Sequence, residues 1–182
     1  MITLTRKENG TLLKYSDGAF LVCDISEKEI KSLKSYLCGY SLDMCKSHIN
    51  DIPLPKDLST YTDEKIKEIC EGHTINDISI DELISLEPTT DERGGLPRLV
   101  KRFNSRATIP TVEELLRIYL VRDELDTLNS KGYVFKNMLA RERVATVSLY
   151  SNPFYYYCIE NETLTIDGLS SNCVTFPIIR LD

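Results

Sequence analysis

A thiol and an imidazole stand close together in the segment Cys70-Glu71-Gly72-His73, at a spacing that occurs in metal sites. A structural zinc ion would need two more ligands, and only His48 and scattered cysteines could supply them. We therefore predict neither a metal ion nor another cofactor. We interpret Cys70 as a cysteine at a helix end that is followed by a glycine cap.

The six cysteines form no Cys-x-x-Cys pair. The first seven residues also hold no continuous apolar stretch of the kind that a signal peptide requires, so export by the general pathway is not expected. Both observations favour reduced, mostly buried thiols. Cys158 and Cys173 could approach each other across neighbouring strands, but free thiols are the preferred interpretation.

Signals for catalysis are weak. Both histidines, His48 and His73, lie in the N-terminal half, and no Ser/His/Asp or Cys/His order can be assigned. Gly94-Gly95 lacks the Lys-Ser/Thr or the third spaced glycine of a phosphate-binding loop. The carboxylates fit helix starts and turns better than an acid/base pair. We therefore predict a protein that is not an enzyme.

Two groups of residues could bind a partner instead. Tyrosine is favoured at protein contacts, and successive strand residues face opposite sides, so Tyr155 and Tyr157 share one face while Tyr156 takes the other. An aromatic core is the alternative for this cluster. A basic run between 93 and 106 fits a solvated loop or a subunit contact, with an anion or nucleic-acid site as the alternative. The candidate binding residues are Tyr150, Tyr155, Tyr156, Tyr157, Asn152, Arg98 and Arg102.

Composition narrows the function classes. The chain of 182 residues has a net charge of −6, with 42% hydrophobic and 27% charged residues, as in ordinary globular proteins. No broad cationic surface is available for nucleic-acid phosphates, so a nucleic acid is not an expected partner. No apolar run approaches the roughly 20 residues of a membrane span.

The elements that must position these residues begin with a β-meander. Asn9-Gly10 and Asp17-Gly18 are turn signals that separate three short β-prone runs within 2–23. Ser26 and Glu29 fit a capping box. Apolar residues at helical spacing then predict a helix that runs to about residue 47 and buries one stripe. The stripe consists of Ile30, Leu33, Leu37, Tyr40 and Met44.

Further along, short helices are predicted at about 63–71 and 80–86, the second from a capping box at Ser79. The segment 87–95 combines proline, charges and paired glycines, as linkers do. We place a boundary there and predict two units, 1–92 and 93–182. The first is a meander-plus-helices unit that could serve as a docking domain.

The C-terminal unit begins with a capping box at Thr111 and Glu114, behind Pro110. We expect one helix from there to about residue 128 and a β-rich remainder after Gly132. The expected strands are 144–150, 154–159, 164–166 and 174–179, with turns at Asn161-Glu162 and Asp167-Gly168. One helix and a run of antiparallel strands predict an α+β fold class.

This order of elements resembles the C-type-lectin-like superfamily over about 95–182. The nearest likeness is to bacterial and phage domains related to the formylglycine-generating fold and the Lcl adhesion domain. Ile109-Pro110-Thr111 matches a Leu-Pro-Thr motif and Glu114-Leu115 a Glu-Leu motif. Val147-Ser148 takes the Trp-Ser position, and 155–157 and 174–180 match the aromatic and closing strands. The calcium-site signatures of true lectins, Glu-Pro-Asn and Trp-Asn-Asp, have no counterpart.

The resemblance implies a rigid scaffold that usually binds rather than catalyses. We therefore expect a non-enzymatic structural or interaction protein, a phage or prophage virion component that contacts proteins or attaches to a host surface. Its expected partners are proteins, including copies of itself in a homo-oligomer or larger assembly, and its expected location is the virion or the host cytoplasm. A carbohydrate-binding adhesin and a small enzyme of unknown reaction are the alternatives.

Overall fold

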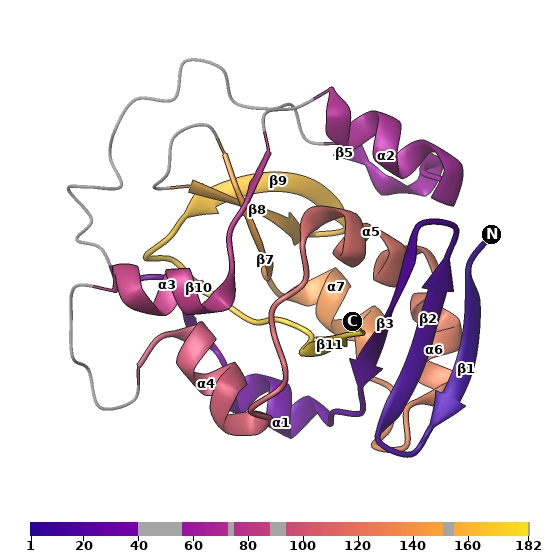
Figure 1. Cartoon of the computed structure of the whole chain (residues 1–182), viewed down its shortest axis with the longest axis horizontal. Helices are drawn as coiled ribbons and strands as arrows, with labels where there is room; N and C mark the ends of the chain where they lie inside the picture. Colours follow the sequence, from indigo (N-terminus) through magenta and orange to yellow (C-terminus); the bar gives the residue numbers. More distant parts are fainter. Residues whose placement is uncertain (40–55, 73–74, 88–93, 151–154, 182) are drawn as a thin grey trace.

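The computed structural model describes residues 1–39, 56–72, 75–87, 94–150 and 155–181 (Figure 1). Helices and strands are both present, and the named strands pair antiparallel throughout. The predicted α+β class is therefore confirmed.

The first sheet contains the predicted meander. Its strands are β1 (Thr3–Lys7), β2 (Gly10–Tyr15) and β3 (Gly18–Cys23). The two-residue turns that join them, at 8–9 and 16–17, each lie one residue before the predicted pair, so Gly10 and Gly18 begin strands. A fourth strand, β11 (Ile178–Arg180), pairs antiparallel with β3. The predicted closing strand therefore joins the N-terminal meander, and Figure 1 shows it beside β3.

The second sheet contains the meander predicted near the C-terminus. Its strand order is β5-β9-β8-β7-β6. The short edge strands come from the N-terminal half, and a separate small pair joins β10 to β4. The bounds are β5 (Lys56–Asp57), β6 (Asn76–Asp77), β7 (Val144–Leu149), β8 (Tyr155–Glu160), β9 (Thr163–Gly168), β4 (Ser35–Tyr36) and β10 (Asn172–Cys173).

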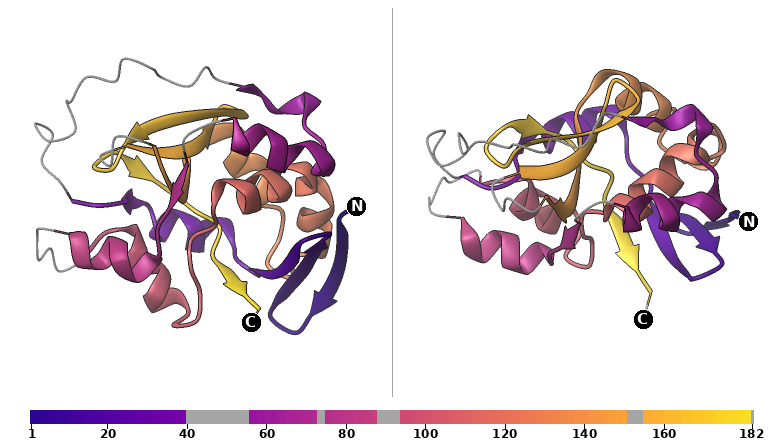
Figure 2. Two further views of the ribbon diagram at one scale, coloured as in Figure 1. Left: turned by 45° about the horizontal axis from the view of Figure 1, so that its top comes forward. Right: turned by 90° about the horizontal axis from the view of Figure 1, so that it is seen from above.

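Helices α5 and α7 lie between the two larger sheets, and α6 lies behind β1 and β2 in the view of Figure 1. Helix α5 contacts β7 as well as α2, as Figure 2 shows from two other sides. Side chains cap several helix starts, as predicted: capping boxes are present at Ser26 and at Thr111, and the Ser79 hydroxyl accepts from the Glu82 amide. The bounds are α1 (Glu27–Ser32), η2 (Leu58–Thr60), α2 (Asp63–Glu71), α3 (Ile80–Leu86), α4 (Leu96–Phe103), α5 (Val112–Leu120), α6 (Arg122–Leu128) and α7 (Phe135–Arg141).

Helix α1 is much shorter than the predicted helix to residue 47. It ends at Ser32, and the chain then enters β4, where it pairs with β10. Ile30, Leu33 and Leu37 are buried as predicted, but Leu37 lies directly after β4 and not in a helix. Apolar spacing alone does not distinguish these two routes into a core. Tyr40 and Met44 lie outside the described residues.

The C-terminal half contains more helix than predicted. The expected helix 111–128 is interrupted at Val121, whose backbone angles (φ −115°, ψ 22°) are not helical, so α5 and α6 are separate. The region after Gly132, predicted to be β-rich, first forms α7. The basic run predicted as a solvated loop forms α4 over Leu96–Phe103.

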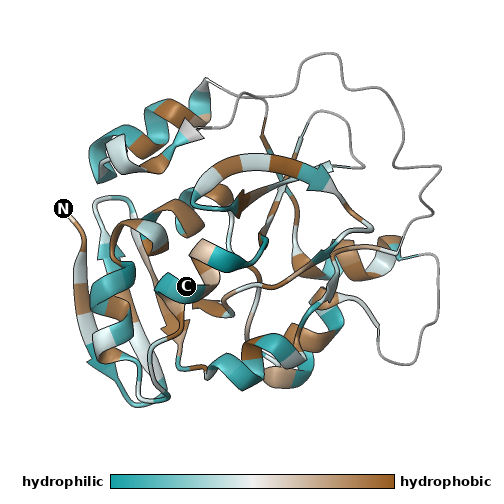
Figure 3. Cartoon of the chain, turned by 180° about the vertical axis from the view of Figure 1, so that it is seen from behind, coloured by the Kyte–Doolittle hydropathy of each residue, from teal (hydrophilic) through white to brown (hydrophobic). Residues whose placement is uncertain are grey.

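One hydrophobic core serves both halves of the sequence. It includes Phe20 and Ile30 from the first half and Leu116, Val144 and Phe176 from the second. Figure 3 shows hydrophobic residues on the central strands and on one side of the helices. The predicted boundary near residue 92 lies outside the described residues, and each sheet pairs strands from 1–92 with strands from 93–182. The two predicted units therefore share their sheets and their core.

Candidate functional site

A polar cleft of about 420 Å³ opens beside the first hairpin. Its volume lies within the range of roughly 300–1,000 Å³ that is typical of ligand pockets. Polar side chains reach it from the hairpin turn, the end of β3, helix α1, the segment after α4 and the loop after α6. Those that carry the argument below are Glu8, Cys23, Asp24, Glu29, Asn104, Arg106, Ser130 and Lys131.

Asp24 anchors one side of the cleft. Its carboxylate is 8% exposed and accepts hydrogen bonds from both terminal nitrogens of Arg6, with Nη1 at 2.6 Å. The Ser130 hydroxyl donates to it at 2.9 Å. Burial by itself would raise the pKa of Asp24, but the hydrogen bonds from Arg6 and Ser130 outweigh it and hold the pKa below its usual value. Asp24 is therefore a fixed anion that joins β1 to the loop after α6.

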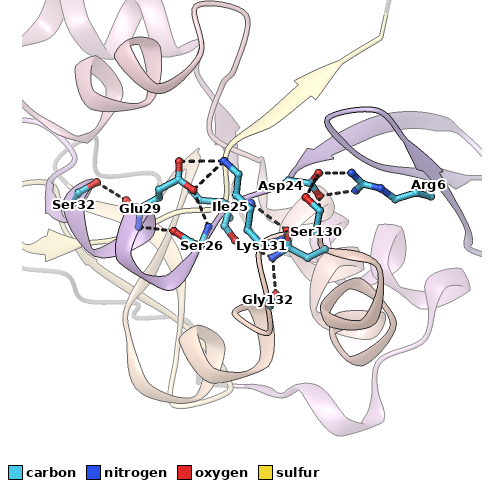
Figure 4. A network of polar contacts seen from close by, with 10 residues as sticks. Arg6, Asp24, Ile25, Ser26, Glu29, Ser32, Ser130, Lys131 and Gly132 are labelled. Atoms are coloured by element: carbon cyan, nitrogen blue, oxygen red, sulfur yellow. Dashed lines mark hydrogen bonds and ion pairs between the residues drawn. The ribbon is translucent and has the colours of Figure 1, made fainter.

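Glu29 and Lys131 form the other side of the cleft. Lys131 Nζ lies 3.0 Å and 3.2 Å from the two carboxylate oxygens of Glu29, one of which also accepts from the Ser26 amide at 3.1 Å. Burial opposes ionisation of Glu29, yet the hydrogen bonds from Lys131 and Ser26 lower its pKa. Figure 4 shows this pair next to the Asp24–Arg6 pair.

Asn129 holds the loop after α6 in place between these pairs. Its side-chain oxygen accepts from the Ile25 amide at 3.2 Å, and its Nδ2 donates to the carbonyls of Ile25 and Gly132, both at 2.8 Å. The loop that carries Ser130 and Lys131 is thus fastened to the segment between β3 and α1 (Figure 4). The cleft walls are preorganised by contacts that need no ligand.

The thiol in the cleft is not activated. Cys23 is buried, and burial raises its pKa to about 11, with the neighbouring Asp24 adding to the rise. A thiol with that pKa is protonated near neutral pH, whereas the thiolate is the nucleophile. The carboxylates of Asp24 and Glu29 are engaged in ion pairs. Cys23 is therefore not held ready as a nucleophile, and Asp24 and Glu29 contribute fixed, paired charges to the cleft.

Of the four tyrosines predicted to bind a partner, only Tyr150 and Tyr155 are partly exposed. Tyr156 and Tyr157 are 0% and 1% exposed because both faces of β8 are covered, so neither ring contributes to a binding surface. Burial raises the pKa of Tyr157 to about 12 and that of Tyr156 well above its ordinary value. Tyr150 packs edge-on against Tyr157, with ring centroids 6.1 Å apart, and Tyr155 is half-buried. The alternative of an aromatic core was correct for two of the four.

The other predicted site residues lie elsewhere. Arg98 and Arg102 are on α4, where Arg98 Nε donates to Glu87 at 3.0 Å and Arg102 is exposed. Asn152 lies outside the described residues. The structure therefore places Tyr150 directly after β7, the other three tyrosines on β8 and the two arginines on α4, and neither group lines the polar cleft.

Metal ligation finds no support within the described ranges, where no group of three or more His, Cys, Asp or Glu side chains could hold an ion. The two histidines lie outside those ranges. The described cysteines are free and buried, as predicted, and burial raises the pKa values of Cys70 and Cys173 to about 12.

Sequence reasoning missed the residues of the cleft. Only Glu29 had a local signal, the capping box with Ser26, and that signal describes a helix start. Its partner Lys131 stands 102 positions later, and Ser130 stands 106 positions after Asp24. Nothing in the local pattern joins such distant residues.

No family model, no curated protein and no solved structure matches the chain at a significant level. Among the described residues, no helix combines the length and the apolar character needed to cross a membrane.

Proposed function

We propose that this chain is a non-enzymatic interaction protein that contacts a partner through its polar cleft. One observation carries the proposal: Asp24 and Glu29 in the cleft walls are held in ion pairs with Arg6 and Lys131, and the Cys23 thiol is held protonated. Paired, immobilised charges give a binding surface register and specificity. General acid/base or nucleophilic catalysis needs a group that is poised to exchange a proton or attack.

The context that we propose is a phage or prophage virion, with the protein acting in assembly or in attachment to a host surface. The resemblance of 95–182 to lectin-like bacterial and phage domains motivates this context. The corresponding locations are the virion and the host cytoplasm. An antibody against the chain should then detect it in purified particles from an induced lysate, and a host enzyme assayed in parallel should be absent. Its complete absence from particles would contradict the virion assignment.

Self-association is part of the same proposal. Size-exclusion chromatography with light scattering, over a series of protein concentrations, should reveal species heavier than the 20.8 kDa monomer. A monomer at every concentration would count against a homo-oligomer, and it would leave the contact with a different partner to be tested separately.

A further inference from the structure

Two charged side chains that line the cleft, Glu8 and Arg106, form no ion pair within the described part of the protein. Among the described residues, neither the Glu8 carboxylate nor the Arg106 guanidinium has a hydrogen-bond or ion-pair partner, and both residues are exposed. In contrast, Asp24, Glu29 and Lys131 are all paired within the protein. The two remaining charges have opposite sign and face one cleft.

Both charges stand on anchored backbone. The Glu8 carbonyl accepts from Arg6 Nη2 at 3.1 Å, and the Asn9 carbonyl in the same turn accepts from the Asp24 amide at 3.0 Å. On the other side, the Arg106 amide donates to the Asn104 side chain at 2.9 Å. These hydrogen bonds hold the backbone of both residues at the edge of the cleft.

The cleft favours neither sign of charge. The carboxylates of Glu8, Asp24 and Glu29 are matched by the cations of Arg6, Arg106 and Lys131. A ligand with one charge would meet one of the two free groups and face repulsion from the other, whereas a ligand with both charges would pair with each. Apolar contact is available from Leu21, Phe103 and Ile179 in the same wall.

We propose that this cleft binds a zwitterionic ligand, in which a carboxylate and an ammonium group lie close together. Arg106 pairs with the carboxylate, for which a guanidinium is suited because it can donate two parallel hydrogen bonds. Glu8 pairs with the ammonium group. A volume of about 420 Å³ fits one or two amino-acid residues, either as a free dipeptide or as neighbouring acidic and basic side chains of a protein segment. This inference deepens the proposed function by naming the chemistry of its ligand.

The test uses alanyl-leucine and its derivatives as probes, with binding followed by chemical shifts of the cleft amides in the full chain. Acetylation of the dipeptide removes the ammonium charge, and amidation removes the carboxylate. N-acetyl-Lys-Glu-amide carries the two charges on side chains and represents a protein segment. Arg106→Ala and Glu8→Gln remove one pairing group each. Arg102→Ala and Glu68→Gln are matched controls, because both residues are exposed on helices outside the cleft.

At least one of the two zwitterionic probes should bind, and each cleft variant should weaken it by about tenfold or more, as expected for the loss of a charge-assisted pair. Arg106→Ala should not further weaken the binding of the amidated dipeptide, which has no carboxylate. Glu8→Gln should not further weaken the binding of the acetylated dipeptide, which has no ammonium group. The control variants should bind like the wild type. Binding of the Lys-Glu peptide alone would identify a protein segment as the source of the ligand.

The proposal is overturned if neither zwitterionic probe shifts the cleft amides up to about 10 mM, beyond the millimolar range of weak specific binding. It is also overturned if the singly charged derivatives bind as well as the dipeptide, or if the cleft variants bind unchanged. Hydrolysis of the dipeptide by the wild type would instead contradict the non-enzymatic function, and it is scored separately from binding in the same samples.

Discussion

At the residue scale, Asp126 caps the start of α7, because the residue at the N-cap position, Val134, has no side chain that can accept a hydrogen bond. Its carboxylate, 7% exposed, accepts from the amides of Val134 and Phe135 at 2.7 Å and of Lys136 at 3.1 Å. Asp126→Ala should leave these donors without partners and lower the free energy of unfolding by about 3 kcal/mol. Urea denaturation measures the loss. The exposed Asp123→Ala on the same helix should change stability by less than about 0.5 kcal/mol, and equal losses would contradict the assigned role.

The paired carboxylate of Asp24 should make stability depend on pH. Its pKa in the folded state is held below the ordinary value of about 3.9, so its contribution is complete above that value and is lost as pH falls through the folded-state pKa. The difference in unfolding free energy between wild type and Asp24→Asn should therefore be largest near neutral pH and shrink below about pH 4. Urea titrations at several pH values test this. A difference that does not change with pH would refute it, and the exposed Asp17→Asn is the control.

The same residues show why the candidate site could not be predicted from one sequence. Tyr156 and Tyr157 attract attention because aromatic residues suit both interfaces and cores, and only the packing of β8 decides between them. Ser130 and Lys131 carry no local signal, since their partners Asp24 and Glu29 lie more than 100 positions away. Single-sequence patterns report on neighbours within a helix turn or a hairpin.

At the element scale, the β8–β9 turn was recognised from sequence, and the structure shows that it carries strain. Asn161 and Glu162 both have positive φ, 54° and 59°, as a type I′ turn requires, and glycine is preferred at the second position. Glu162→Gly should relieve this strain and stabilise the protein by about 0.5 kcal/mol after the loss of a weak contact with Arg122. Thermal unfolding should show a higher midpoint. Glu162→Ala removes the same contact without relieving the strain and should not stabilise.

Elements with local signals were predicted well, and elements stabilised from afar were not. The meander turns and the caps at Ser26 and Thr111 depend on residues that lie within a few positions of one another in the sequence. Helix α7 is capped by Asp126, eight residues before Val134, and α4 begins at Leu96 behind Gly95, without a side-chain cap. For α1 the local signal was misleading. The helical spacing of apolar residues continues beyond Ser32, but the pairing of β4 with β10 ends the helix there, so the predicted helix was too long.

At the scale of the whole molecule, the pairing of strands from both halves predicts that the protein folds as one cooperative unit. Strand β11 completes the N-terminal sheet, while β5 and β6 form the edges of the C-terminal sheet. Each half alone would expose an unpaired strand and part of the shared core, so the segments 1–92 and 93–182 should not fold when produced separately.

Unfolding of the full chain should accordingly be a single transition. Far-UV circular dichroism reports the backbone, and tyrosine fluorescence reports the core because the chain has ten tyrosines and no tryptophan. The two signals should give coincident urea curves, as two-state unfolding requires. The separate halves should show neither a cooperative transition nor a dispersed amide spectrum. Two resolved transitions, or one half with a dispersed spectrum, would show that the shared sheets are not needed for folding and would restore the division near residue 92.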